Sequence, residues 1–145
     1  SSEGARLAQL FSAWVNESAR LVDEAEGLAA AQPEALRQRL TAQMQELLNG
    51  GTALSEDRLA QEVALLATRA DVREELDRLK AHVQDARALL KSGEAVGRKL
   101  DFLSQEFNRE ANTLCSKSTD IALTRVGLAL KAVIDQFREQ AQNVE

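Results

Sequence analysis

The stretch VREELDRLKAHVQDARALL, residues 72–90, carries the pattern that decides the fold. Its apolar residues recur at alternating spacings of four and three, which is typical of a helix that packs along another helix. These residues are Val72, Leu76, Leu79, Val83, Ala86 and Leu90. No part of the chain shows the period-two alternation of a half-buried strand. The sequence therefore predicts an all-α fold.

The helical period continues on both sides of this stretch. Residues 3–31 predict a first helix, and Pro33 is placed to open a second helix that runs to about residue 48, because proline is well tolerated in the first turn. Further apolar stripes cover residues 100–114 and 123–144. We expect an antiparallel bundle of four to five helices, with the long helices from residue 55 onward.

Two boundaries follow from local signals. Asn49-Gly50-Gly51 predicts the end of a helix and a loop, and Ser55 is a candidate N-cap for the next helix. Asp71, with Glu74 three residues later, predicts either a local helix restart or part of one continuous helix. The sequence leaves these two possibilities open.

Composition narrows the functional classes. The 145 residues are 44% hydrophobic and 28% charged, which suits one folded domain. The single cysteine, Cys115, excludes an intramolecular disulfide framework and fits a reducing compartment, and no apolar run is long enough to span a membrane. The net charge of −5 argues against broad electrostatic adhesion to nucleic acid. Basic residues nevertheless outnumber acidic ones between residues 97 and 138.

One polar stripe borders the apolar seam of residues 72–90. Spacings of four, three and four place its members on one face of the helix. They are Asp71, Glu75, Arg78 and His82, the only histidine. A salt-bridged flank of the helix would explain this stripe, and so would a binding or catalytic site.

A second polar stripe follows the apolar arc of FLSQEFNREANTLCSKS, residues 102–118. Glu106, Glu110 and Lys117 line one side of that arc, and Glu110 lies at its edge. A carboxylate in such a place must be paired, bound to a cation or neutralised. Two carboxylates one turn apart repel unless a cation lies between them, and oxygen ligands suit Mg²⁺ or Mn²⁺. Asp101, Asn108 and Asn112 line the other side.

Several other chemistries lack their sequence signatures. The chain has no Glu-x-x-His pair of a di-iron bundle and no His-Glu-x-x-His zinc helix. Gly93 and Gly97 do not form a phosphate-binding loop. Cys115 and His82 could in principle pair as nucleophile and base, but the position of Cys115 on the apolar arc favours a small core residue.

Three long segments carry a family resemblance. They are SEDRLAQEVALLATRADVREELDRLKAHV (55–83), EAVGRKLDFLSQEFNREANTLCSKS (94–118) and LKAVIDQFREQAQNVE (130–145). Together they resemble the YicC/YloC family of bacterial endoribonucleases, strongly from residue 55 onward and loosely before it. The resemblance implies that residues 55–145 are the family's C-terminal helical domain and that residues 1–54 are a connecting helical pair. It also implies that the family's N-terminal domain is absent from this chain.

The resemblance further implies a cytoplasmic, metal-dependent endoribonuclease that forms homo-oligomers, hexamers in the family, and acts on RNA. Combined with the two stripes, it gives a hypothesis for the site. Glu75, Glu106 and Glu110, with Asp71 or Asp101, hold Mg²⁺ or Mn²⁺. Arg78, Arg109 and Lys117, joined by Asn108 and Asn112, bind RNA phosphates. His82, Glu75, Glu106 and Glu110 are the candidate catalytic residues, with His82 as general acid or base. The alternative is a non-catalytic helical module for oligomerisation or partner binding.

Overall fold

The computed structural model describes residues 2–48, 56–92 and 97–144, and all of its secondary structure is helical. The elements are α1 (Ser2–Leu48), α2 (Glu56–Arg69), α3 (Arg73–Ser92), α4 (Gly97–Lys117) and α5 (Ile121–Val144). The predicted all-α antiparallel bundle is confirmed. The loop expected at Asn49–Gly51 and the N-cap expected at Ser55 lie outside the described residues.

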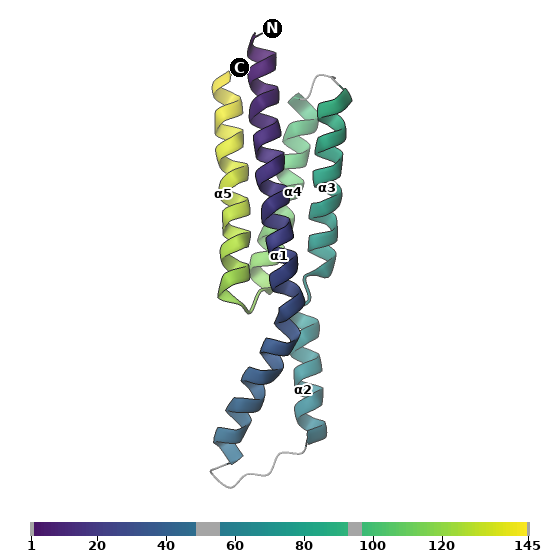
Figure 1. Cartoon of the computed structure of the whole chain (residues 1–145), viewed down its shortest axis with the longest axis vertical. Helices are drawn as coiled ribbons and strands as arrows, with labels where there is room; N and C mark the ends of the chain where they lie inside the picture. The colour runs from purple at the N-terminus through teal and green to yellow at the C-terminus, as the bar shows by residue number, and fades with distance from the viewer. Residues whose placement is uncertain (1, 49–55, 93–96, 145) are drawn as a thin grey trace.

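Four of the helices form an up-and-down bundle. Around the bundle, α1 packs against α3, α3 against α4, α4 against α5, and α5 against α1. Each helix runs antiparallel to both of these neighbours, and both chain ends lie at the same end of the bundle (Figure 1). No helix in the described ranges has an apolar stretch that could cross a membrane.

Aromatic and aliphatic side chains fill the bundle. The ring of Trp14 stacks on Phe137 of α5, with centroids 5.1 Å apart, and meets Phe107 of α4 edge-on at 4.9 Å. Phe107 is fully buried, as are Leu79 and Leu114 on either side of the α3–α4 contact. Offset and edge-on aromatic pairs of this kind add stability beyond the burial of their area. The core therefore fixes how α4 is rotated toward α3.

The prediction of two helices separated at Pro33 was wrong. The long helices expected from residue 55 onward are present as α3, α4 and α5, but α1 is longer than any of them. A single 47-residue helix, α1, contains Pro33. A proline inside a helix removes one hydrogen bond and bends the axis, but does not end the helix where packing holds both sides. Gln32 donates a hydrogen bond to Thr119 Oγ1 at 2.7 Å, and Leu36 is buried. Beyond this point α1 leaves the bundle at a changed angle and pairs with α2 (Figure 1).

A helix restart separates α2 from α3, which resolves the two possibilities left open at Asp71. Asp71 Oδ1 accepts a hydrogen bond from the backbone N–H of Arg73 at 2.9 Å, the geometry of an N-cap. The Arg73 guanidinium also pairs with the Asp71 carboxylate at 2.7 Å. α3 is therefore a separate helix from α2, and its polar stripe faces α4.

We predict that Asp71→Ala lowers the free energy of unfolding by about 1 kcal/mol at pH 7, because α3 loses its cap. The Arg73 side chain, and then its backbone N–H, hold the pKa of Asp71 below its ordinary value. A lowered carboxyl pKa stabilises the fold above the unfolded pKa, so the difference from wild type should shrink as the pH falls below about 4. Urea unfolding of wild type and variant, followed by circular dichroism at pH 7 and below about pH 4, measures this difference in the free energy of unfolding.

Asp71→Asn is the matched control for this prediction, because its amide oxygen can still cap the helix. A loss for Asp71→Asn as large as that for Asp71→Ala would show that the cap is not the cause.

Candidate functional site

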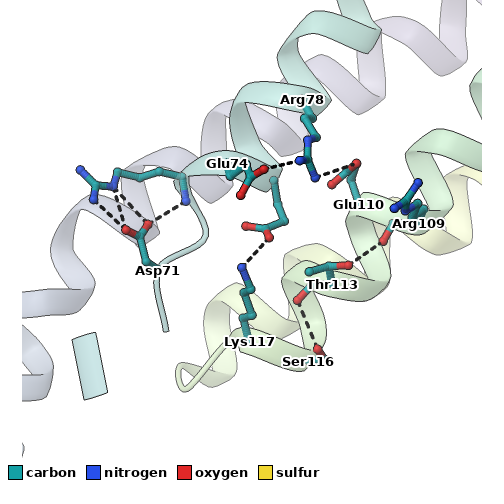
Figure 2. Close-up of polar contacts among 10 residues, drawn as sticks. Asp71, Glu74, Arg78, Arg109, Glu110, Thr113, Ser116 and Lys117 are labelled. Carbon is teal, nitrogen blue, oxygen red and sulfur yellow. Dashed lines mark hydrogen bonds and ion pairs between the residues drawn. The ribbon is translucent and has the colours of Figure 1, made fainter. Parts of the chain in front are cut away.

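The two predicted polar stripes face each other across the contact between α3 and α4. Lys117 Nζ of α4 lies 2.6 Å from Glu75 Oε1 of α3, and Arg78 Nη1 of α3 lies 3.6 Å from Glu110 Oε1 of α4. From the first pair to the second, the residue numbers rise along α3 and fall along α4, as antiparallel packing requires. Figure 2 shows the Arg78–Glu110 pair bridging the two helices. The two ion pairs therefore bring part of each stripe together.

Glu75 and Lys117 form the first of these pairs. The Glu75 side chain is only 3% exposed, whereas that of Lys117 is 36% exposed. Removing a carboxylate from water is costly unless a partner compensates it. Glu75 Oε1 accepts a hydrogen bond from Lys117, while Oε2 is buried without a hydrogen-bond partner in the described structure. The hydrogen bond to Glu75 raises the pKa of Lys117, so the ammonium stays charged at neutral pH.

Arg78 and Glu110 form the second pair. The Glu110 side chain is 4% exposed and that of Arg78 is 49% exposed. The Arg78 guanidinium also bonds to Glu74, which lies one turn earlier on α3 and is largely exposed (Figure 2). Arg78 therefore bridges a solvent-facing carboxylate and a buried one.

Glu110 also belongs to a group that can hold a metal ion. One ligand atom each from His82, Glu106 and Glu110 lie within 4.8 Å of one another, and we call these three residues the His82 cluster. His82 packs against the Phe107 ring at a centroid distance of 5.7 Å, and its Nε2 is buried without a hydrogen-bond partner in the described structure. An imidazole nitrogen and two carboxylates are suitable ligands for a divalent transition metal.

The chemistry of this donor set separates the two predicted ions. Mg²⁺ prefers oxygen ligands and retains several waters, whereas a mixed set of nitrogen and oxygen ligands suits Mn²⁺ and its neighbours in the first transition row. Glu106 and Glu110 are one turn apart on α4, so their charges repel, and a cation between them removes that repulsion. The His82 cluster thus fits a divalent metal, with Mn²⁺ favoured over Mg²⁺.

The remaining predicted metal ligands lie away from the His82 cluster. Asp71 caps α3 and pairs with Arg73. Asp101 pairs with Arg138 of α5 at 3.3 Å, on the other side of α4 from Glu110. Glu75 is engaged by Lys117. The structure therefore brings Glu106 and Glu110 together but does not bring Asp71, Asp101 or Glu75 into the same group.

The predicted phosphate-binding residues are also divided. Arg109 is exposed next to Glu110, and Arg78 and Lys117 lie on the α3–α4 face. Asn112 is exposed and Asn108 half-buried, at helix positions turned about half a circle away from Glu110. Arg78 therefore borders the His82 cluster through Glu110, whereas Lys117 pairs with Glu75 outside it and the two asparagines face away.

Two features of the site were not assigned from the sequence. Glu74 was considered only as part of a helix-start signal, yet it is the second partner of Arg78. His82 was predicted as an acid or base rather than as a ligand, and its proximity to Glu106 and Glu110 depends on the helix register. Cys115 is separate from both, since its thiol lies 3.9 Å from the Thr124 carbonyl oxygen between α4 and α5. Burial raises the pKa of that thiol, although Cys115 is half-buried rather than the core residue that the sequence had predicted.

A cavity of about 660 Å³ lies where α1 leaves the bundle. Its lining includes Gln32, Pro33 and Val72, with Asp71 and Arg73 on the side of α3. This cavity shares Asp71 with the predicted metal ligands but contains no member of the His82 cluster. The cluster is therefore a separate site, on the α3–α4 face.

Comparisons with known proteins agree on one family. The family described as "Endoribonuclease YicC-like, C-terminal" matches residues 25–145. A protein of Haemophilus influenzae named "Probable endoribonuclease YicC" is 43% identical over 143 residues, covering 99% of this chain and 49% of that protein. A Clostridioides difficile protein of the same name is 37% identical over 145 residues, covering all of this chain and 50% of that protein. The chain spans about half the length of the curated relatives it matches.

We predict that Lys117→Met lowers the free energy of unfolding by about 2 kcal/mol, because the buried Glu75 carboxylate loses its partner. Adding Glu75→Gln should recover part of this loss. Since the pKa of Lys117 is raised, its contribution is complete below the unfolded value of about 10.4 and is lost as the pH rises through the folded value. The gap between wild type and variant in urea unfolding should therefore narrow above that pH.

The exposed Lys91 at the end of α3 provides the control, as Lys91→Met removes the same charge without unpairing a buried group. An equal effect of the two substitutions would contradict a stabilising role for the Glu75–Lys117 pair.

Proposed function

This chain belongs to the YicC-like endoribonuclease family, and from that membership together with the His82 cluster we propose that it is the metal-binding half of an RNA-cleaving enzyme. The observation that carries the proposal is the convergence of His82, Glu106 and Glu110 within 4.8 Å, beside cationic side chains of α3 and α4. The substrate is RNA, and the reaction is hydrolysis of internal phosphodiester bonds.

The roles proposed for the cluster follow from burial and donor type. Glu106 and Glu110 supply carboxylate oxygens and His82 supplies a ring nitrogen to a divalent cation, Mn²⁺ in preference to Mg²⁺. A cation held there lowers the pKa of a bound water and offsets negative charge on phosphate. We assign His82 the role of a ligand rather than of a general base, because one of its ring nitrogens lies within 4.8 Å of carboxylate oxygens of Glu106 and Glu110.

The cations around the cluster hold the substrate. Arg109 is exposed one residue before Glu110, and Arg78 is half-exposed on the facing helix. Guanidinium groups bind phosphate oxygens in a planar, bidentate manner, so this pair can orient an RNA backbone over the cluster. Local positive charge together with a metal ion offsets the net charge of −5, which would otherwise repel RNA.

A second proposal competes with catalysis by this half. The chain spans half the length of its relatives, and the segment formed by α2 and the end of α1 projects beyond the bundle (Figure 1). These features suit a helical module that assembles with further copies or with a part such as the half of the relatives that this chain does not cover, while cleavage occurs elsewhere. In that case the polar stripes of α3 and α4 serve structure and assembly.

One assay separates the two proposals. The 145-residue chain is incubated with a labelled hairpin RNA, with Mn²⁺ or with EDTA, beside the full-length Haemophilus relative. Cleavage by the chain that EDTA abolishes supports the first proposal. RNA binding or self-association without cleavage, where the full-length protein does cleave, supports the second.

We predict that Glu106→Gln combined with Glu110→Gln reduces Mn²⁺-dependent cleavage by more than about 100-fold, because two of three metal ligands are lost. The helical circular dichroism signal should be kept. The matched control is Asp77→Asn with Asp85→Asn, which removes the same charge from exposed positions of α3. Cleavage that survives the first pair of substitutions, or is lost equally in the control, would exclude this metal site.

A further inference from the structure

Arg78 is held between two carboxylates that differ in burial. Its Nη1 lies 3.6 Å from Glu110 Oε1, and its other terminal nitrogen bonds to Glu74. The Glu110 side chain is 4% exposed, whereas that of Glu74 is 65% exposed. In Figure 2 the guanidinium points from α3 toward both groups. One of its two contacts is therefore internal, and the other is on the surface.

Glu110 has two competing uses. Its carboxylate is the internal partner of Arg78, and it is also a member of the His82 cluster. A divalent cation that binds the cluster brings a second positive charge to the same carboxylate. Two cations at such short range repel strongly in a partly buried setting. Arg78 and a metal ion therefore cannot both use Glu110 fully.

Arg78 has an alternative position, unlike the other cation of this face. It is half-exposed and keeps an anchor in Glu74, one turn earlier on its own helix. Lys117 instead pairs with Glu75, which is not part of the His82 cluster. A metal ion in the cluster would therefore not compete with Lys117 for its partner. Released from Glu110, the planar guanidinium retains donors that match a phosphate group.

We infer that Arg78 is a metal-gated phosphate ligand. Without a metal ion it neutralises the buried charge of Glu110. When a divalent cation occupies the His82 cluster, Arg78 leaves Glu110 and turns to an RNA phosphate. This inference rests on the metal site of the proposed function and adds an order to it, because RNA binding through Arg78 follows metal binding.

Mn²⁺ titration tests the competition without reference to activity. Free Mn²⁺ is followed by electron paramagnetic resonance with the 145-residue chain and its variants. Arg78→Gln should tighten Mn²⁺ binding about tenfold, within the usual range of coupling between two sites. Arg109→Gln is the matched control, because it removes the same charge next to Glu110. No ion pair of Arg109 is found among the described residues, so its effect on Mn²⁺ affinity should stay below about twofold.

RNA binding tests the second half of the gate. Fluorescence anisotropy with a 2′-O-methyl hairpin RNA, checked on a gel to be intact, should show that Mn²⁺ raises the affinity of the wild type. Arg78→Gln should lose most of that gain. Arg78→Lys keeps the charge and the pairing with Glu110, so it should bind Mn²⁺ like the wild type but gain less RNA affinity, because lysine lacks the guanidinium fork.

The outcomes separate the inference from the proposed function. Mn²⁺ binding that is lost in the Glu106→Gln, Glu110→Gln variant but unchanged in Arg78→Gln overturns the gate and leaves the metal site in place. An absence of Mn²⁺ binding by the wild type overturns both. Tighter Mn²⁺ binding in Arg78→Gln, with a loss of the Mn²⁺-induced gain in RNA affinity, supports the gate.

Discussion

The register of α3 against α4 is the constraint on which the site depends. Phe107 is fully buried between Trp14 of α1 and His82 of α3, so α4 cannot slide along its neighbours without opening the core. In this register the pairs Glu75–Lys117 and Arg78–Glu110 meet across the contact. A shift of one turn would leave two buried carboxylates without cations, which apolar packing could not compensate. Core packing and charge pairing therefore select the same arrangement.

The same register gives the α3–α4 face its mixture of charges. Each buried carboxylate of the face has a cationic partner that reaches it from the side of the solvent, as the exposed fractions of Lys117 and Arg78 indicate. The two pairs differ in what else is nearby. Among the described residues Glu75 pairs with Lys117 alone, so this pair serves stability, whereas Glu110 also lies beside His82 and Glu106. Function can thus depend on one pair while the other keeps the helices aligned.

Much of this architecture could be predicted from periodicity, because helical spacing defines which face of a helix is apolar. Val72, Leu76, Leu79, Val83 and Ala86 were expected in the core and are buried, although the seam ends at Leu89 rather than Leu90. Periodicity does not define which residues of another helix lie opposite. Glu75 was therefore expected at the edge of a seam and is in fact buried, and the placement of His82 beside Glu110 could not be derived. The prediction of a helix boundary at Pro33 was wrong for a related reason, because tertiary packing that the local sequence does not encode lets the helix continue.

The position of the site within the bundle bears on the competing proposals. A module that served assembly alone would have no need to place a histidine ring nitrogen beside the carboxylates of Glu106 and Glu110, which repel each other unless a cation lies between them. A fully engaged ion-pair network would stabilise α3 on α4 better than the arrangement observed. The convergence of a ring nitrogen of His82 with carboxylate oxygens of Glu106 and Glu110, more than the number of charges on the face, is what favours metal binding over a purely structural role.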